Sequence, residues 1–414
     1  MKVEVITIGD ELLIGQVIDT NSAWIGKELN TLGLELYRIT SVQDDKDDIL
    51  RVLNEAYMRS DLILITGGIG PTKDDITKQT LCEFFQTELI FDEEAYKNVE
   101  RIFSARGREV NRLSATQAWV LKSAEIIQNQ KGTAPVSWIQ KDDKIFVSMP
   151  GVPVEMKWAM KEAIIPKIIA HFELNQVILH RTCLVKDYTE SALAEYLESW
   201  ENNLPDDIKL AYLPSPGVIR LRLTLRGVGD LILFKEKLDK QVDQLKLLLG
   251  NALYEVSDVP IGEFIGNLLK QKKLTFAAAE SCTGGYISHQ ITAISGSSAY
   301  FKGGIIAYSN EVKENLLCVK SETLLNFGAV SREVAEQMVL GVKELLQVDA
   351  AVAVTGIAGP EGGTLEKPVG TVWIAAAFHD QLISRLYRYG NDREQNIIRT
   401  TNDALFLIAQ LIEN

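Results

Sequence analysis

Apolar positions in the first 172 residues fall into two patterns that alternate along the chain. Residues 3–8 and 62–65 form short, mostly apolar runs, as buried strands do. Residues 21–32 and 46–59 instead carry apolar side chains three or four positions apart, which is the spacing of one helix face. Strands that alternate with helices predict βαβ units around a parallel sheet, in a domain that we end at residue 172.

The pattern changes between residues 176 and 253. A strand, a helix at about 191–200, an alternating strand at 218–225 and a second helix follow one another there. This order predicts a small α+β unit, which would be a spacer or a dimerisation module. Arginines at 220, 222 and 226 could form a nucleic-acid face, but residues two apart on a strand more often form its solvated side.

The remaining residues, 258–414, return to alternating strands and helices. Strands are expected at 276–279, 303–308, 350–355 and 370–377. Apolar residues at helical spacing between them, such as Val334, Met338 and Val342, predict helices that pack on a sheet. The chain is therefore expected to hold two α/β domains joined by a small α+β unit.

Charge, cysteine and histidine content exclude several classes of protein. Lys and Arg number 43 against 56 Asp and Glu, and the net charge of −13 disfavours nucleic acid as a partner. The four cysteines form no CxxC and the four histidines have no metal-ligand spacing, so any metal would be held by carboxylates. No apolar run approaches the roughly 18 residues that span a bilayer, and the first residues resemble a strand more than a signal peptide. We therefore expect a cytoplasmic protein that does not bind membranes.

A serine that could act as a nucleophile follows the strand at 276–279, in the segment AESCTGG (279–285). Ligands of α/β proteins bind where a strand ends and a helix begins, because unpaired amides and the helix dipole there hold a phosphate or an oxyanion. Ser281 is therefore a candidate nucleophile, although serine is also a common helix cap.

A lysine is the best candidate for the base that Ser281 needs, because His289 would lie two turns along the same helix. The segment GGIIAYSNEVK (303–313) predicts a strand that leads into a helix, with Lys313 in the first helical turn. The helix dipole lowers the pKa of a cation there, as a base at neutral pH requires. Tyr308 could relay or orient the proton, and a solvated surface lysine is the alternative.

Glycines crowd a third segment, TGIAGPEGG (355–363), which again follows an apolar strand. Such a loop can wrap a phosphate or a ribose, or it can be a tight structural turn.

Taken together, AESCTGG, GGIIAYSNEVK, GAVS (328–331) and TGIAGPEGG with KPVGTVW (367–373) resemble the C-terminal domain of the CinA family, the nicotinamide-nucleotide amidohydrolases. The resemblance implies hydrolysis of nicotinamide mononucleotide to nicotinic acid mononucleotide and ammonia, without a cofactor. It makes Ser281 the nucleophile, Lys313 its base and Tyr308 the hydroxyl between them. The substrate-binding residues that it implies are Thr283, Gly284, Gly285, Asn310, Thr355, Gly356, Gly359, Gly362 and Gly363.

Three glycines and two aspartates follow the strand at 62–65 in the segment TGGIGPTKDDIT (66–77). The glycines allow the backbone to surround an anion, and Asp74 and Asp75 could bind a hard cation through oxygen. Aspartates are also common at a helix N-terminus for capping alone.

This segment, with GDELL (9–13) and MPGVPVE (149–155), resembles the molybdopterin-binding fold family. The resemblance implies either metal-dependent cleavage of ADP-ribose to AMP and ribose 5-phosphate or binding of molybdopterin. A site made of oxygen ligands alone suits Mg²⁺, Mn²⁺ or Co²⁺. The nucleotide-site residues that it implies are Asp10, Glu11, Asn21, Gly67, Gly68, Gly70, Pro71, Thr72 and Glu155, with Asp74 and Asp75 as metal ligands.

These features predict a molybdopterin-binding-fold domain at 1–172, a small KH-like domain at 176–253 and an amidohydrolase domain at 258–414. The KH-like assignment follows from the family resemblance, but the segment has no GxxG loop, so RNA binding is not expected. We expect a homodimeric enzyme of pyridine-nucleotide salvage that acts on small nucleotides. The alternative is a non-catalytic nucleotide-binding scaffold for competence or the response to DNA damage.

Overall fold

The computed structural model describes residues 1–174, 176–255 and 259–413. The chain divides into two compact units, residues 1–180 with 224–238 and residues 181–223 with 239–414. The expected three-domain division stays a prediction, and its limits at 258 and 414 lie outside the described residues. No helix within the described ranges is long and apolar enough to cross a membrane.

The N-terminal sheet has six strands in the order β2-β1-β3-β8-β7-β6. These are β1 (Val3–Ile8), β2 (Leu36–Val42), β3 (Leu62–Thr66), β6 (Glu125–Ile127), β7 (Val136–Lys141) and β8 (Lys144–Met149). The pairs β1-β2, β1-β3 and β3-β8 are parallel, whereas β7 pairs antiparallel with both β8 and β6. The parallel sheet expected from the alternating pattern is confirmed, and β7 and β6 extend one edge of it by antiparallel pairing.

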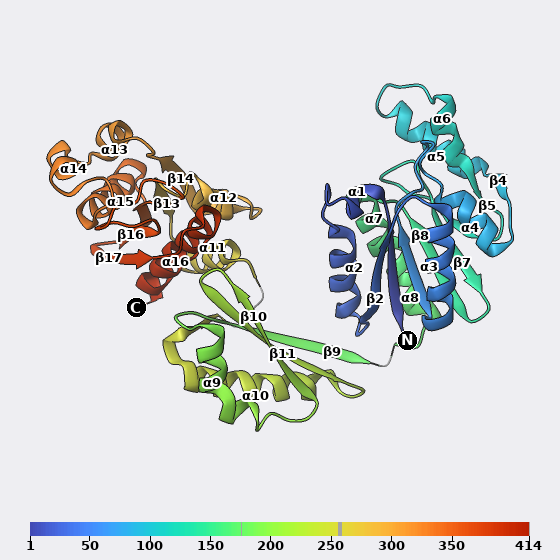
Figure 1. Ribbon diagram of the computed structural model, residues 1–414, viewed down its shortest axis with the longest axis horizontal. Coiled ribbons are helices and arrows are strands. Elements are labelled where there is room, and N and C mark those ends of the chain that lie inside the picture. The colour runs from blue at the N-terminus through green and yellow to red at the C-terminus, as the bar shows by residue number, and fades with distance from the viewer. Residues whose placement is uncertain (175, 256–258, 414) are drawn as a thin grey trace. The chain divides into compact units, whose positions relative to one another are not determined.

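Helices cover both faces of this sheet (Figure 1). They are α2 (Thr20–Thr31), α7 (Pro153–Ala159), the π-helical η2 (Met160–Ile164) and α8 (Ile165–His171) on one face, and α3 (Lys46–Arg59) and α4 (Thr77–Phe85) on the other. The remaining helical segments of this part are α1 (Asp10–Leu13), α5 (Glu93–Ser104), α6 (Arg112–Ala115) and the 3₁₀ turn η1 (Thr116–Ala118). Val5 and Leu64 pack with α2, α7 and α8, whereas Ile6 and Ile65 pack with α3 and α4. Successive strand residues point to opposite faces, so a strand buried on both sides must be apolar at almost every position. A short two-stranded sheet, β4 (Leu89–Phe91) with β5 (Trp119–Leu121), completes this part.

A second sheet has the order β10-β11-β9-β12. Its elements are β9 (Val177–Val185), α9 (Glu190–Glu201), β10 (Ile208–Ser215), β11 (Val218–Gly227), α10 (Leu231–Leu249), η3 (Gly250–Ala252) and β12 (Leu253–Glu255). The boundary between the two compact units falls within β9 and β11. Leu221, Leu223 and Leu225 are buried, whereas Arg220, Arg222 and Arg226 are exposed, as expected for the solvated side of a strand.

The C-terminal sheet has the order β14-β13-β15-β16-β17. Its strands are β13 (Phe276–Glu280), β14 (Phe301–Ile306), β15 (Ala350–Gly356), β16 (Thr371–Phe378) and β17 (Gln381–Arg388). β13 pairs parallel with β14 and β15, whereas β15-β16 and β16-β17 are antiparallel. Strand β14 lies two residues earlier in the chain than expected.

Both faces of the C-terminal sheet carry helices (Figure 1). They are α11 (Ile261–Lys272), α12 (Tyr286–Thr292), η4 (Ser297–Ala299), α13 (Asn310–Leu317), α14 (Ser321–Phe327), α15 (Arg332–Leu346) and α16 (Arg393–Glu413). One apolar core joins α11, α12 and α16 to the sheet, and a second joins α13 and α15 to its other face. The carboxyl ends of β13, β14 and β15 are thereby brought to one edge, where ligands of α/β proteins bind.

Candidate functional site

Ser281 is the first residue after β13, and it is buried. Its backbone N–H donates to the carbonyl of Val354 on the neighbouring strand, at 3.1 Å. Helix α12 begins only at Tyr286, so Ser281 does not stand at a helix N-terminus as the sequence predicted. Gly284 and Gly285 have φ angles of +61° and +102°, and these left-handed residues turn the chain before the helix can start.

Lys313 contacts Ser281 directly. Its Nζ donates to Ser281 Oγ at 3.1 Å and to the carbonyl of Ala307 at 2.7 Å, and the residue is 1% exposed. Helix α13 begins at Asn310 with Ser309 as its cap, which places Lys313 in the first turn as predicted. Burial lowers the pKa of this lysine. The solvated-lysine alternative is therefore wrong.

Tyr308 does not occupy the place expected for it. Its side chain is 63% exposed, and its hydroxyl accepts a hydrogen bond from Arg393 Nη2 at 3.2 Å. The direct contact between Ser281 and Lys313 leaves no position for a hydroxyl between them. Arg393, which also donates to the carbonyl of Gly359 at 2.8 Å, was not predicted because it begins α16, 85 residues after Tyr308.

Glu280, for which the sequence predicted no role, anchors the loop that carries Ser281. Its fully buried carboxylate accepts hydrogen bonds from the Thr283 hydroxyl, from the backbone N–H groups of Gly285, Ile287 and Ser288, and from the Ser288 hydroxyl, at 2.7 to 3.0 Å. A carboxylate that accepts five hydrogen bonds fixes the path of residues 281–288. The sequence feature that could have predicted this role is an acidic residue at the end of an otherwise apolar strand.

The neighbouring Cys282 is not a competing nucleophile. Burial raises the pKa of its thiol to about 12, so the reactive thiolate is scarce at neutral pH.

Several residues expected to bind substrate make structural contacts within the protein. The hydroxyl protons of Thr283 and Thr355 are donated to Glu280 and to the carbonyl of Ala329, both at 2.7 Å. Gly356 ends β15, and a Cβ there would lie 2.6 Å from Val372 Cγ2. Four of the expected substrate-binding residues are exposed to solvent: Gly284, Asn310, Gly362 and Gly363.

A second candidate site is a cavity of about 540 Å³ at the carboxyl ends of β1, β3 and β8. The expected residues that line it are Glu11, Asn21, Gly67, Gly68, Gly70, Pro71, Thr72, Asp74, Asp75 and Glu155. Asp10 does not line it; its backbone N–H and carboxylate pair with the carboxylate and N–H of Asp44, at 3.3 and 3.2 Å. A Cβ on Gly67 would lie 2.0 Å from the carbonyl of Ile8, so the close approach of β1 and this loop requires glycine.

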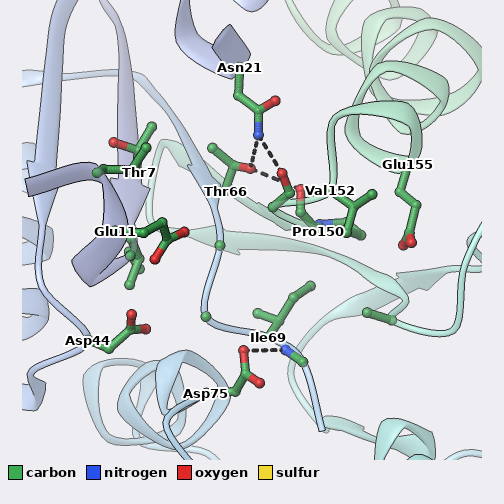
Figure 2. Close-up of a pocket in the computed structure, with 18 of the residues that line it drawn as sticks. Thr7, Glu11, Asn21, Asp44, Thr66, Ile69, Asp75, Pro150, Val152 and Glu155 are labelled. Atoms are coloured by element: carbon green, nitrogen blue, oxygen red, sulfur yellow. Dashed lines mark hydrogen bonds between the residues drawn. The ribbon is translucent and has the colours of Figure 1, made fainter. Parts of the chain in front are cut away.

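The cavity is acidic. Asp44, which was not predicted, joins Glu11, Asp75 and Glu155 in its lining (Figure 2). Burial raises the pKa of Asp44, and the charges of Asp10, Glu11 and Asp75 raise it further. Burial also raises the pKa of Glu155, although Asn129 donates to its carboxylate at 2.7 Å. No Lys, Arg or His is among the described residues that line the cavity.

The expected metal ligands Asp74 and Asp75 fit a cation poorly. Asp75 already accepts hydrogen bonds from the N–H groups of Gly70 and Thr72, at 2.7 and 3.0 Å, and from the Thr72 hydroxyl. Asp74 is exposed. No group of three or more acidic, His or Cys side chains in the described chain is arranged to hold a metal ion. Asp44 fits better, because its buried Oδ1 has no hydrogen-bond partner among the described residues.

Comparison with known proteins matches both halves of the chain. Residues 259–412 match the CinA C-terminal domain, and residues 4–170 match the probable molybdopterin binding domain. A CinA-like protein of Flavobacterium psychrophilum is 44% identical over 99% of this chain and 98% of its own length. A putative competence-damage inducible protein of Thermoanaerobacter pseudethanolicus is 35% identical over 100% of this chain and 98% of its own.

Among solved structures, the competence/damage inducible protein CihA of Agrobacterium tumefaciens is 39% identical. The match covers 37% of this chain and 94% of that one, with a TM-score of 0.36. Because the full-length relatives match from end to end, the chain belongs to the CinA family.

Proposed function

We propose that the C-terminal site hydrolyses the carboxamide of a nicotinamide nucleotide, nicotinamide mononucleotide, to the carboxylate and ammonia. The observation that carries this proposal is the 3.1 Å contact between Lys313 Nζ and Ser281 Oγ in a buried setting. A serine is a weak nucleophile until a neighbouring base takes its proton, and a lysine with a lowered pKa is such a base. The family resemblance, rather than the geometry, supplies the nicotinamide nucleotide as substrate.

The two residues can carry the whole reaction. Neutral Lys313 takes the hydroxyl proton while Ser281 Oγ bonds to the amide carbon, and the carbonyl oxygen becomes an oxyanion. The lysine then protonates the amide nitrogen, the C–N bond breaks, and ammonia leaves an acyl-serine. Water, deprotonated by the same lysine, attacks the ester carbon. The carboxylate is released, and the proton returns to Ser281.

Backbone amides beside Ser281 suit the oxyanion. The N–H group of Cys282 bonds only to the thiol of the same residue, and the N–H group of Thr283 has no acceptor among the described residues. Glu280 holds the turn that they belong to, so both amides are fixed before substrate binds. Donors fixed in advance stabilise a developing negative charge without reorganisation. Arg393 adds a positive charge near this loop that suits a substrate phosphate.

The test is ammonia release from nicotinamide mononucleotide by the purified chain and by Ser281→Ala. We expect the wild-type protein to release ammonia and nicotinic acid mononucleotide, and Ser281→Ala to lose this activity with an unchanged melting temperature. The matched control is Ser298→Ala, at an exposed serine in the same domain, which should keep wild-type turnover. Wild-type turnover in Ser281→Ala removes Ser281 from the mechanism, and an inactive wild-type chain favours the scaffold alternative.

The N-terminal cavity supports a second function, metal-dependent cleavage of ADP-ribose to AMP and ribose 5-phosphate. The observation that favours it is the unpartnered Asp44 oxygen in an acidic cavity without a lining cation, because a diphosphate can enter only with a positive ion. Mg²⁺ is often held by one or two carboxylates together with substrate phosphates and water. Asp44 is the side chain that would hold it here, and the ion would neutralise the diphosphate.

Calorimetric titration with ADP-ribose, with and without Mg²⁺, and chromatography of the products test this second function. Binding that requires the metal, followed by release of AMP, is the expected result. If neither metal-dependent binding nor AMP release is observed, the cavity binds molybdopterin or no nucleotide at all.

A further inference from the structure

Gln117 has a buried side-chain amide at the N-terminal cavity, and only one of the two polar atoms of this amide has a hydrogen-bond partner in the protein. It belongs to η1, is 1% exposed and lines the cavity. Its Oε1 accepts a hydrogen bond from Lys78 Nζ at 3.0 Å, but its Nε2 has no partner among the described residues. A lysine ammonium can only donate, so the oxygen must face Lys78 and the NH₂ group is left free. A buried donor without an acceptor is costly, and it points to a partner that arrives from outside.

We propose that Gln117 is a ligand-binding residue of this cavity, that its amide N–H donates to a phosphate oxygen of a diphosphate nucleotide, and that Lys78 holds and polarises the amide. This inference rests on the nucleotide function proposed for the N-terminal domain.

The charges around the cavity indicate which kind of ligand atom bonds to Gln117. The titratable side chains that line the cavity in the described chain are all carboxylates, which accept and do not donate. Gln117 supplies an N–H donor that no described protein group uses, and the ammonium of Lys78 bonds to its carbonyl oxygen. A cation that bonds to an amide oxygen makes the amide N–H a stronger donor, so an anionic acceptor gains most from it.

Lys78 stays in place to perform this role. Its Nζ also lies 3.4 Å from the carbonyl of Trp119, and the side chain is partly buried. Burial lowers the pKa of Lys78 to about 8, with nearby Asp75 opposing the shift, so the ammonium is still the major form at pH 7.

Asn21 offers the complementary half of the recognition (Figure 2). Its Nδ2 donates to the carbonyl of Gly151 at 2.8 Å and to Thr66 Oγ1 at 3.2 Å, which fixes the amide orientation. Its buried Oδ1 has no partner among the described residues, and Asn21 also lines the cavity. A ligand that brings both an acceptor for Gln117 and a hydroxyl donor for Asn21 satisfies both groups, as a ribose attached to a diphosphate does.

The test is titration of the full chain with ADP-ribose and Mg²⁺, in which wild type is compared with Gln117→Glu. Glutamate keeps an oxygen for Lys78 and the size of the side chain, but it replaces the free donor by a negative acceptor. We expect the dissociation constant to rise at least about tenfold, which corresponds to roughly 1.4 kcal/mol. Gln79→Glu adds the same charge at an exposed position next to Lys78 in sequence and should change affinity less than about twofold.

Each outcome decides a different point. A wild-type chain that binds no ADP-ribose overturns the nucleotide function together with this inference. A wild-type chain that binds, with a Gln117→Glu variant of equal affinity, overturns the role of Gln117 alone. Should Gln117→Glu lower the melting temperature, Gln117→Met provides the second variant, since it removes the donor without adding charge. Wild-type affinity in a folded Gln117→Met chain also overturns the inference.

Discussion

Lys313 Nζ lies 3.1 Å from Ser281 Oγ and 2.7 Å from the carbonyl of Ala307, with no carboxylate paired to it among the described side chains. Ser281 follows β13 and Lys313 follows β14, and these strands are parallel neighbours. A buried lysine without a counter-ion favours its neutral form, which is the form that can take a proton from serine.

The rate of ammonia release should therefore rise with pH. Burial lowers the pKa of Lys313, so the neutral base accumulates as the pH rises through that lowered value. The same shift affects stability: between the folded-state pKa and the unfolded value the unfolded chain binds more protons, so this group adds stability as the pH rises. A profile of kcat against pH checks the expected rising limb.

Lys313→Arg separates a base from a fixed positive charge. Arginine keeps the charge but does not deprotonate, so turnover should fall by at least about a hundredfold while the substrate still binds. Lys320→Arg is the matched control, because Lys320 is exposed and lies before α14. Should Lys313→Arg keep most of its turnover, the proton of Ser281 goes elsewhere.

Glu280→Gln should weaken both the fold and the activity of the C-terminal domain. Each carboxylate oxygen of Glu280 accepts at least two hydrogen bonds, so an NH₂ group in place of either oxygen meets donors. We expect a loss of roughly 2–4 kcal/mol in the free energy of unfolding and a fall in kcat. Chemical denaturation measures the first quantity. Glu344→Gln, an exposed change on α15, should leave both unchanged, and equal stability of the two variants would contradict the anchoring role.

Local patterns predicted the strands β1 and β3 and the helix α3, because each of them carries its own periodicity. The same patterns placed Ser281 just after a strand and Lys313 in the first turn of the helix that follows the next strand. They missed β2 and β17, which lie at sheet edges and expose many of their residues. An exposed edge strand needs no apolar run.

The residues that contact the main site residues were harder to predict than the site residues themselves. Arg393 reaches Tyr308, and Lys78 reaches Gln117 across 39 residues, only because the chain folds these elements together. Sheet order and helix placement decide such contacts, and no local spacing encodes them. The start of α12 was misplaced for a different reason: two glycines in left-handed conformations delay the helix, and residue type alone does not reveal their φ angles.

Asp44→Asn should have opposite effects on stability and on ligand binding. Burial and the neighbouring charges of Asp10, Glu11 and Asp75 raise the pKa of Asp44, so its negative charge is less favourable in the folded protein than in the unfolded chain. Removing that charge should raise the melting temperature, yet Mg²⁺-dependent binding of ADP-ribose should weaken at least about tenfold. Asp143→Asn, at an exposed position after β7, provides the control for a lost surface charge. A variant that is more stable and still binds with wild-type affinity would remove Asp44 as the residue that holds the ion.

A chelator should separate the two activities in one sample. The C-terminal reaction as proposed uses Ser281 Oγ, Lys313 and backbone amides, and none of these groups needs a divalent ion to act. The N-terminal cavity, in contrast, presents carboxylates to a diphosphate and requires a cation between them. With EDTA, ammonia release from nicotinamide mononucleotide should stay within about twofold of its untreated rate, whereas AMP release from ADP-ribose should stop and return when Mg²⁺ is added in excess. Ammonia release that falls with EDTA and recovers with the metal contradicts the serine-lysine mechanism, because the ion would then be required at the C-terminal site. AMP release that persists with EDTA contradicts the role of the cation in the cavity, since the acidic lining would then be accommodating the diphosphate without it.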